Sequence, residues 1–375
     1  MKRSFAFLLR RAIGRLAGLL LSTAVLLTPA AAAAMETLAS GLDYPWALAF
    51  LPNGDVLITE RSGQLKRLQP DGSLSTVDGV PPVYFAGQGG LMDVVLHPAF
   101  ADNGELYLTL AHGTPEANAT RVVRARLSGN ALENVRAIFT AAPLKDTPVH
   151  YGGRLAFLDD GTLLITTGDG FNYREAAQDL TSLLGKTVRL NDDGSIPADN
   201  PFVGDATAED AIYSFGHRNP QGLLVTSDGR ILLHEHGPRG GDEINLLKPG
   251  ANYGWPATTY GTDYTGAAVS PFRALAGVSE PHMVWVPSIA PAGFTIVTSE
   301  RFADWRGDLL VGALVNQQVR RVELGADWQS SQDHAAFPEL SARIREVREG
   351  PEGCLYVLTD GPGGSLVRFC SNVAS

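Results

Sequence analysis

One pattern of hydrophobic and polar positions recurs along the chain. An apolar run with alternating character leads into a polar turn that contains glycine, and a second apolar run follows. Four clear copies and two looser ones occupy residues 47–59, 94–110, 155–167, 223–234, 300–314 and 347–359. Period-two alternation around Asn-Gly, Asp-Gly or Glu-Gly turns is typical of β-hairpins. The pattern therefore predicts six β-hairpins.

The spacing of these hairpins predicts how they assemble. Intervals of 46 to 78 residues separate the turn glycines, which are Gly54, Gly104, Gly161, Gly229, Gly307 and Gly353. Each interval has room for two more strands, and four-stranded units that repeat at about 40–50 residues are typical of β-propellers. We predict an all-β fold, a six-bladed β-propeller with four-stranded antiparallel blades, in which the extra length of the middle blades lies in loops.

One segment has helical rather than strand periodicity. Between Tyr173 and Lys186, alanine and leucine recur on one helical face, and Gly185 stands near the expected end. Apolar residues at helical spacing followed by glycine are typical of a helix and its C-terminal stop. We predict a helix here, inserted into the propeller and not forming a second domain.

The first 34 residues have the pattern of a secretory signal peptide. They carry five basic side chains, no acidic one, an apolar core over residues 17–27 and alanines over 30–34. A retained membrane anchor is the alternative, but the apolar core is shorter than the ~20 residues of a membrane span. We expect residues 1–34 to be a cleaved signal peptide, residues 35–375 to form one propeller domain, and the mature protein to be periplasmic or secreted.

Charge excludes several classes of partner. Five of the 30 Lys and Arg residues lie in the leader, so 25 remain against 40 Asp and Glu residues, a formal charge of −15 with histidine neutral. An acidic protein of this kind binds nucleic acid and anionic membranes poorly. We therefore expect no nucleic-acid partner and no membrane insertion of the mature chain. We also expect the mature chain to be a monomer or a homodimer.

A histidine and an aspartate flank one predicted hairpin. His150 precedes it and Asp169 follows it, and a hairpin returns the chain to its starting end. Asp169 can therefore lie near His150 and orient its imidazole, which makes His150 a candidate general base. A histidine with a purely structural role is the alternative.

Two further segments have the residue types of ion-binding sites. Residues 237–241 contain Gly and Pro, which leave carbonyls free, and Asp242 and Glu243 follow. Such oxygen ligands suit calcium, although an acidic turn is an equal alternative. His234 and His236 share a strand face, but without obvious further ligands we assign them to packing and hydrogen bonding rather than to a transition metal.

Arginines gather at two places. Arg218 lies in the loop Gly-His-Arg-Asn-Pro, and Arg343 and Arg345 are spaced to share one strand face. Paired guanidinium groups suit a polyanionic ligand, whereas ordinary pairing with surface acids is the alternative.

Taken together, several long motifs resemble one family. They are YPWALAFLPNGDVLITER, GQGGLMDV, VHYGGRLAF, LLGKTVRLNDDGSIPADNPF, SFGHRNPQGL, HEHGPRGGDEINLLKPGANYGWP and RIREV. In this order, from about Gly41 to the C-terminus, the chain resembles the soluble quinoprotein aldose sugar dehydrogenases, which are related to soluble glucose dehydrogenase. The family's six-bladed propeller agrees with the number of repeats.

The resemblance implies pyrroloquinoline quinone (PQQ) and calcium as cofactors. It makes His150 the base with Asp169 behind it, and Arg218 the residue that stabilises the reduced quinone oxygen together with calcium. It also implies residues that bind the quinone and residues that bind calcium. The quinone ligands would be Gln88, Arg218, Asn219, Tyr264, Arg343 and Arg345. The carbonyls of Gly237 and Pro238 would bind the catalytic calcium, and Glu243 with the carbonyl of Tyr253 would bind a second calcium.

The implied activity is oxidation of the anomeric carbon of an aldose sugar to a lactone. His150 would remove the hydroxyl proton while hydride passes to PQQ, and an unidentified acceptor would take the electrons. A calcium-dependent lactonase on a similar propeller is the main alternative, and a propeller that only binds a partner is a third.

One position departs from the family. The family often has lysine directly after Gly-Ala-Leu, where this chain has Val315. A carboxylate of the cofactor is therefore expected to lack one cationic partner, unless Asn316 or Gln317 supplies a neutral donor instead.

The two cysteines lie near the C-terminus. If the last hairpin turns about Pro362, Cys354 and Cys370 each lie eight residues from the turn and face each other. In an oxidising compartment we expect them to form a disulfide, with two buried thiols as the alternative.

Overall fold

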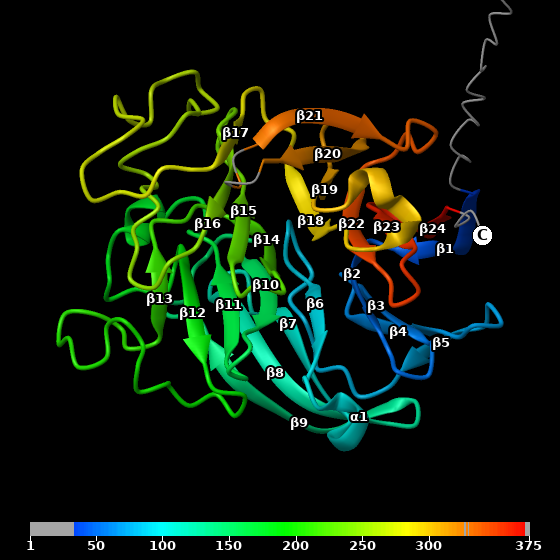
Figure 1. Cartoon of the computed structure of the whole chain (residues 1–375). Helices are drawn as coiled ribbons and strands as arrows, with labels where there is room; N and C mark the ends of the chain where they lie inside the picture. Colours follow the sequence, from blue (N-terminus) through cyan, green and yellow to red (C-terminus); the bar gives the residue numbers. More distant parts are fainter. Residues whose placement is uncertain (1–33, 326–327, 329, 372–375) are drawn as a thin grey trace, which may run out of the picture. The chain divides into compact units, whose positions relative to one another are not determined.

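The computed structural model describes residues 34–325, 328 and 330–371. Within these residues, 24 strands form six four-stranded antiparallel sheets. Figure 1 shows the sheets in sequence colours, with the labels used below. The predicted signal peptide, residues 1–34, lies outside the described residues except for Ala34.

Five of the sheets each take four consecutive strands, in chain order from the first to the last. The first sheet contains β2 (Pro45–Phe50), β3 (Val56–Glu60), β4 (Gln64–Leu68) and β5 (Leu74–Val77). The second contains β6 (Leu91–Leu96), β7 (Glu105–Gly113), β8 (Asn118–Ser128) and β9 (Ala131–Thr140). The third sheet contains β10 (Gly152–Phe157), β11 (Leu163–Thr167), β12 (Lys186–Leu190) and β13 (Ile212–Phe215). The fourth contains β14 (Pro220–Val225), β15 (Ile231–Glu235), β16 (Asp242–Leu246) and β17 (Met283–Trp285). The fifth contains β18 (Pro291–Ile296), β19 (Leu309–Ala313), β20 (Gln318–Leu324) and β21 (Ser330–Ala336).

The sixth sheet joins the two ends of the described chain. Its strands are β22 (Ile344–Glu349), β23 (Leu355–Thr359), β24 (Pro362–Cys370) and β1 (Ala34–Asp43), with Ala34 opposite Cys370. The first strands of the sheets contact one another in the closed order β2, β6, β10, β14, β18, β22 and back to β2. The sheets are therefore the blades of a six-bladed β-propeller, as the sequence predicts.

The six turn glycines that recur in the sequence occupy equivalent positions in the blades. All six lie between the first and second strands of a blade, and all have positive φ, for example 90° at Gly54 and 81° at Gly161. Two of these turns also contain short helices, α1 (Phe100–Asn103) and η2 (Glu300–Trp305). A residue with a Cβ is strained at positive φ, which explains glycine at these positions.

The hydrophobic core lies between neighbouring blades. Leu57 of the first blade packs in one cluster with Leu108 of the second, and Leu48 of the first packs in another with Leu358 of the sixth. Each sheet therefore buries side chains on both faces, which the continuous apolar runs in its inner strands reflect.

The helix predicted over residues 173–186 is wrong. The structure has only a short 3-10 helix there, η1 (Arg174–Ala177), followed by turns before β12. The ammonium group of Lys186 is buried and donates to the carbonyls of Ala176 at 2.7 Å and Leu184 at 2.7 Å, which bends the segment back on itself. Distant segments also hold it, because the backbone N–H of Leu183 donates to the carbonyl of Ala142 and Nε2 of Gln178 donates to the carbonyl of Trp255. These tertiary contacts override the helical periodicity. None of the helices in the described part of the chain is long and apolar enough to cross a membrane.

Extra length in the middle blades lies in loops, as predicted. The longest connections join β12 to β13 over residues 191–211 and β16 to β17 over residues 247–282.

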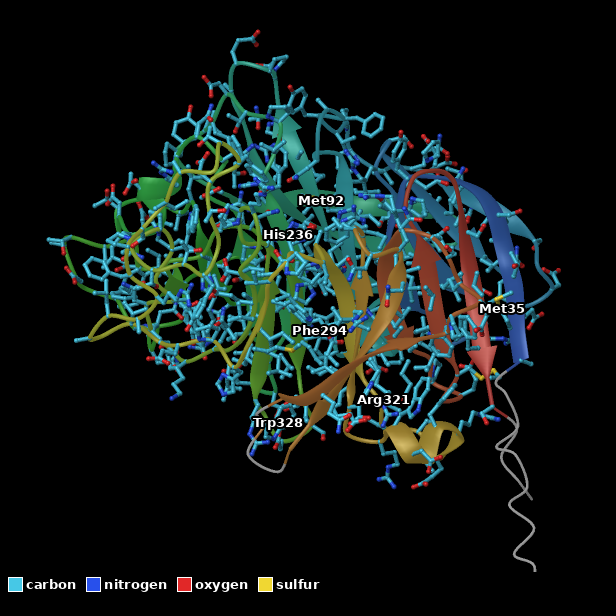
Figure 2. All side chains as sticks on the ribbon, turned by 90° about the horizontal axis from the view of Figure 1, so that it is seen from above. Met35, Met92, His236, Phe294, Arg321 and Trp328 are labelled. Carbon is cyan, nitrogen blue, oxygen red and sulfur yellow. A yellow bond between two sulfur atoms is a disulfide. The ribbon has the colours of Figure 1, made fainter. Side chains whose placement is uncertain are left out.

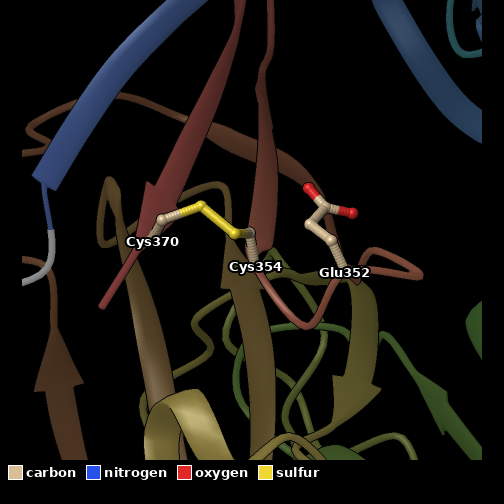
Figure 3. A group of neighbouring side chains, drawn as sticks. All are labelled: Glu352, Cys354 and Cys370. Atoms are coloured by element: carbon tan, nitrogen blue, oxygen red, sulfur yellow. A yellow bond between two sulfur atoms is a disulfide. The ribbon is translucent and has the colours of Figure 1, made fainter. Parts of the chain in front are cut away.

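The predicted disulfide between Cys354 and Cys370 is confirmed. Leu355 of β23 pairs with Phe369 of β24, so the two cysteines lie across the mouth of the last hairpin, and their sulfurs are bonded with the Cα atoms 4.7 Å apart (Figure 3). Met35 of β1 pairs with Phe369 on the other side, at the periphery of the molecule (Figure 2). The bridge therefore fastens the blade that also holds the first strand.

Candidate active site

A cavity of about 520 Å³ opens where the six blades meet. Every blade contributes to its lining, through the first strand and the loops beside it. Among the lining residues are Trp46, Arg61, Gln88, Met92, Tyr151, Asn219, Gln221, His236, Ala290, Val315, Arg343, Arg345 and Asp360; Figure 2 labels Met92 and His236. Four of the residues expected to bind the quinone, Gln88, Asn219, Arg343 and Arg345, thus share one cavity.

His150 and Asp169 form a buried pair beside this cavity. The Nδ1 of His150 lies 2.7 Å from Oδ1 of Asp169, and the second carboxylate oxygen accepts from Nε1 of Trp255 at 2.7 Å. The backbone N–H of His150 donates to Oε1 of Gln88 at 2.8 Å. The sequence places these residues correctly because β10 and β11 form the hairpin that brings residue 169 back to residue 150.

The surroundings of His150 favour its neutral form. Burial lowers the pKa of the imidazole, the hydrogen bond and charge of Asp169 offset part of this effect, and the positive charges of Arg218 and Lys145 lower the pKa further. Because Asp169 accepts from Nδ1, the neutral ring carries its proton there and leaves a lone pair on Nε2. This is the tautomer that a general base requires.

Arg218 lines a second, smaller hollow of about 270 Å³ on the other side of His150. Its Nη1 donates to the carbonyl of Gly237 at 2.7 Å, and its Nη2 lies 3.5 Å from the hydroxyl of Tyr264. Tyr264 and Phe171 line this hollow with Arg218 and Pro238, and the Phe171 ring contacts the ring of His150 edge to face. His150 therefore lies between the central cavity and a hollow with aromatic and charged walls.

Asn219 has a polar group without a partner. Its Oδ1 accepts from the backbone N–H of Gly152 at 3.2 Å, whereas its Nδ2 is buried and has no hydrogen-bond partner among the described residues. A buried, unpaired amide donor is costly unless a ligand satisfies it. Since Asn219 lines the central cavity, this donor fits a ligand with acceptor oxygens or nitrogens.

Arg343 and Arg345 both reach the central cavity, but an acid lies between them. Nε of Arg343 donates to Oδ2 of Asp360 at 3.1 Å, and Nη2 of Arg345 donates to Oδ1 at 3.2 Å. Although burial opposes it, the charges of the two arginines hold the pKa of Asp360 below its usual value. Asp360 therefore orients both guanidinium groups and neutralises part of their charge.

The expected calcium ligands divide between two hollows. Gly237, Glu243 and Tyr253 line one small hollow together with Glu235, and Pro238 lines the hollow of Tyr264. Burial and the charge of Glu235 raise the pKa of Glu243 well above its usual value.

The same small hollow has features that fit a cation. The Nδ2 of Asn245 lies between the two carboxylates, 3.4 Å from Glu235 and 3.5 Å from Glu243, and its Oδ1 is buried without a partner among the described residues. A buried carboxylate, a half-buried one and an unpaired amide oxygen are the ligand types that calcium prefers. The carbonyl of Gly237, in contrast, already accepts from Arg218.

His234 and His236 bind the backbone of the next blade. The Nε2 of His236 lies 2.7 Å from the carbonyl of Pro291, and that of His234 contacts the carbonyl of Ala292. The packing and hydrogen-bonding role predicted for them agrees with these contacts.

Sequence reasoning missed several residues of the site. Trp255 stood in a recognised motif, but nothing in its spacing showed that its indole reaches Asp169. Arg61 lines the central cavity, and the buried Lys145 donates to Oδ1 of Asn118 at 2.9 Å behind the loop of His150. Long-range partners such as Asp360 for Arg345 have no local sequence signal.

Comparison with known proteins places this geometry in context. The family model described as Glucose / Sorbosone dehydrogenase matches residues 42–368. The chain is 42% identical over 342 residues to aldose sugar dehydrogenase YliI of Escherichia coli, which covers 89% of this chain and 92% of that protein. It is 28% identical over 429 residues to quinoprotein glucose dehydrogenase B of Acinetobacter calcoaceticus, which covers 91% and 89%.

Solved structures agree. The apo-form of the soluble aldose sugar dehydrogenase from Escherichia coli superposes with a TM-score of 0.87 at 40% identity, covering 91% of this chain and 100% of that one. The PQQ-bound form of an aldose sugar dehydrogenase from Streptomyces coelicolor gives a TM-score of 0.74 at 27% identity, covering 92% and 99%.

Proposed function

Since the chain belongs to the glucose/sorbosone dehydrogenase family, we propose that it oxidises the anomeric carbon of aldose sugars to lactones with PQQ and calcium as cofactors. The observation that carries this proposal is the buried, neutral imidazole of His150, oriented by Asp169 between a cationic cavity and an open hollow. The related proteins named as quinoprotein and as PQQ-bound support the choice of cofactor.

The central cavity fits a planar polycarboxylate. Arginine side chains line it, Gln88 lies at its wall, and the unpaired Nδ2 of Asn219 supplies a donor within it. PQQ, when bound, supplies a two-electron acceptor for the hydride of the sugar. The residues of this cavity would bind the cofactor, and the residues around His150 would orient the sugar for the transfer.

His150 is the residue that moves the proton. Its Nε2 accepts the proton of the anomeric hydroxyl, and Asp169 stabilises the imidazolium that results. Arg218 holds a fixed positive charge next to His150, where negative charge develops during the transfer. Tyr264 and Phe171 are exposed aromatic residues of the second hollow, and aromatic side chains suit the apolar face of a sugar.

The carbonyls of Gly237 and Pro238 would hold the catalytic calcium, and Glu243 with the carbonyl of Tyr253 would hold a second one. Gly237, Glu243 and Tyr253 line one hollow, and Pro238 lines the hollow of Tyr264. We further propose that residues 1–34 are removed on export, that the remaining residues form one propeller domain in the periplasm or outside the cell, and that an unidentified acceptor takes the electrons.

Reconstitution tests the function. Purified protein is incubated with PQQ and calcium, and reduction of a dye is followed with a panel of aldoses. The proposal expects aldose-dependent dye reduction that requires PQQ. Lactone hydrolysis with calcium alone would instead support the lactonase alternative, and neither activity would support a propeller that only binds a partner.

A further inference from the structure

One cation of the central cavity is not explained by the residues assigned above. Arg61 follows β3 in the first blade and lines the cavity together with Arg345 and Val315. Burial and the charge of Arg345 lower the pKa of Arg61, and the charges of Asp360 and Asp43 offset part of this effect. Three arginines and one aspartate, Asp360, line the cavity, so its wall keeps an excess of positive charge that favours an anionic ligand.

Arg61 differs from the other two arginines in its partners. Arg343 and Arg345 share Asp360, whereas Arg61 has no carboxylate within ion-pair distance in the described part of the chain. Asp360 and Asp43 attract it from a greater distance, but no direct ion pair cancels its positive charge there. In a chain with a large excess of acid, an arginine without a direct ion pair at the wall of a cavity is a specific feature of that cavity.

The guanidinium group is held in a fixed position. Nε donates to the carbonyl of Gly89 at 3.2 Å, and Nη2 donates to the same carbonyl at 3.0 Å and also contacts the carbonyl of Gly87. The rings of Tyr44 and Phe85 each lie 5.5 Å from its carbon. Nη1 makes none of these hydrogen bonds, so it is the donor that remains for a molecule in the cavity.

The position of Val315 makes this donor relevant. Val315 lines the same cavity, is 58% exposed and offers no charge where the family often has lysine. We infer that Arg61 provides the cationic contact to a carboxylate of the bound cofactor that residue 315 does not provide. This inference rests on the proposed function, because it takes PQQ, a planar tricarboxylate, as the ligand.

Arg61 has a second effect that the test must separate from the first. Its bonds to Gly87 and Gly89 flank Gln88, whose side chain accepts from the backbone of His150. A variant without the guanidinium group therefore loses a charge and also loosens the turn of Gln88. Val315→Lys distinguishes the two effects, because it adds a positive charge to the cavity without restoring the hydrogen bonds of Arg61 to Gly87 and Gly89.

The experiment measures PQQ affinity by equilibrium titration of the apo-protein at fixed calcium, without sugar. Arg61→Met is expected to weaken binding at least tenfold, whereas Arg136→Met, an exposed arginine on the outer strand β9, is expected to change it less than twofold. Val315→Lys should restore a large part of the affinity in the Arg61→Met background and add less in the wild-type background. Unchanged affinity in Arg61→Met, or no recovery in the double variant, would overturn the inference.

Benzene-1,3,5-tricarboxylate, which is not a redox cofactor, separates this inference from the proposed function. If the wild type binds PQQ but oxidises no aldose, the proposed function fails and the Arg61 comparison stands on its own. If the wild type binds only the benzene tricarboxylate, the same variants are compared with that probe. A wild type that binds neither compound overturns the inference as well.

Discussion

The Nδ1 of His150 lies 2.7 Å from Oδ1 of Asp169, and both side chains are almost completely buried. The same carboxylate also accepts from the indole of Trp255 and from the backbone N–H of Phe171. Asp169 therefore satisfies three donors with two oxygens, and it fixes both the ring orientation and the tautomer of His150.

Replacing Asp169 by asparagine should lower turnover by about 10²- to 10⁴-fold. The amide has one acceptor oxygen, so either His150 or Trp255 meets an N–H group in place of an oxygen. Steady-state kinetics of the reconstituted enzyme measure the loss. PQQ affinity should remain within a few-fold of the wild type, and a variant with normal kcat would show that Asp169 does not orient the base.

His150→Ala should fold normally and lose most of its turnover, about 10²- to 10⁴-fold, because general-base catalysis contributes on that scale. His112→Ala is the matched control, since His112 lines a separate groove on the second blade. Both variants are compared in dye reduction with a saturating aldose. Near-normal oxidation by His150→Ala would refute its assignment as the base.

The rate should depend on pH through His150. A base must be neutral, and burial lowers its pKa, so kcat/KM should rise with pH and reach its plateau below the ordinary histidine pKa of about 6.5. Lys145, whose own pKa burial lowers to about 7, is positively charged in this acid range and lowers the pKa of His150.

Lys145→Met should therefore raise the pKa of His150 and move the acid limb of the kcat/KM profile to higher pH. Lys248→Met, an exposed lysine in the loop after β16, should leave the limb in place. A limb that stays fixed in Lys145→Met, in protein with an unchanged melting temperature, would contradict the electrostatic coupling.

Calcium should stabilise the protein through the hollow of Glu243. A ligand that binds only the folded state at 100 times its Kd adds about 2.7 kcal/mol to the free energy of unfolding. Chelation should therefore lower the Tm of the wild type. Glu243→Gln removes a charge that the cation compensates, so its Tm should respond much less to calcium. An equal response of both proteins would place the ion elsewhere.

The disulfide should stabilise the sixth blade. A bridge that closes a loop of this length, 16 residues in sequence separation, contributes on the order of 3 kcal/mol by constraining the unfolded chain. The double variant Cys354→Ser/Cys370→Ser should unfold at lower denaturant concentration than the oxidised wild type. A reductant should shift the wild type toward the variant and leave the variant unchanged. Two titratable thiols in the denatured, unreduced wild type would exclude the bridge.

The sequence predicts the fold well because its signals are local. Each hairpin turn needs a glycine with positive φ, and Gly54 and Gly161 show this within a few residues of alternating strand. The proximity of His150 and Asp169 is also predicted from local sequence, because a single hairpin separates the two residues. The predicted helix over residues 173–186 is wrong because the segment bonds to distant parts of the chain, for example from the backbone N–H of Leu183 to the carbonyl of Ala142. The contacts of Trp255 and Arg61 likewise join distant segments.

The pairing of Ala34 with Cys370 also makes the propeller suitable for circular permutation. The two ends of the described chain lie side by side in one sheet, so a short linker would join them without displacing a blade. New ends could then be opened in an exposed loop such as the one around Gly204, far along the chain from the strands that close the ring. The pairing of β1 with β24 would be kept in such a variant.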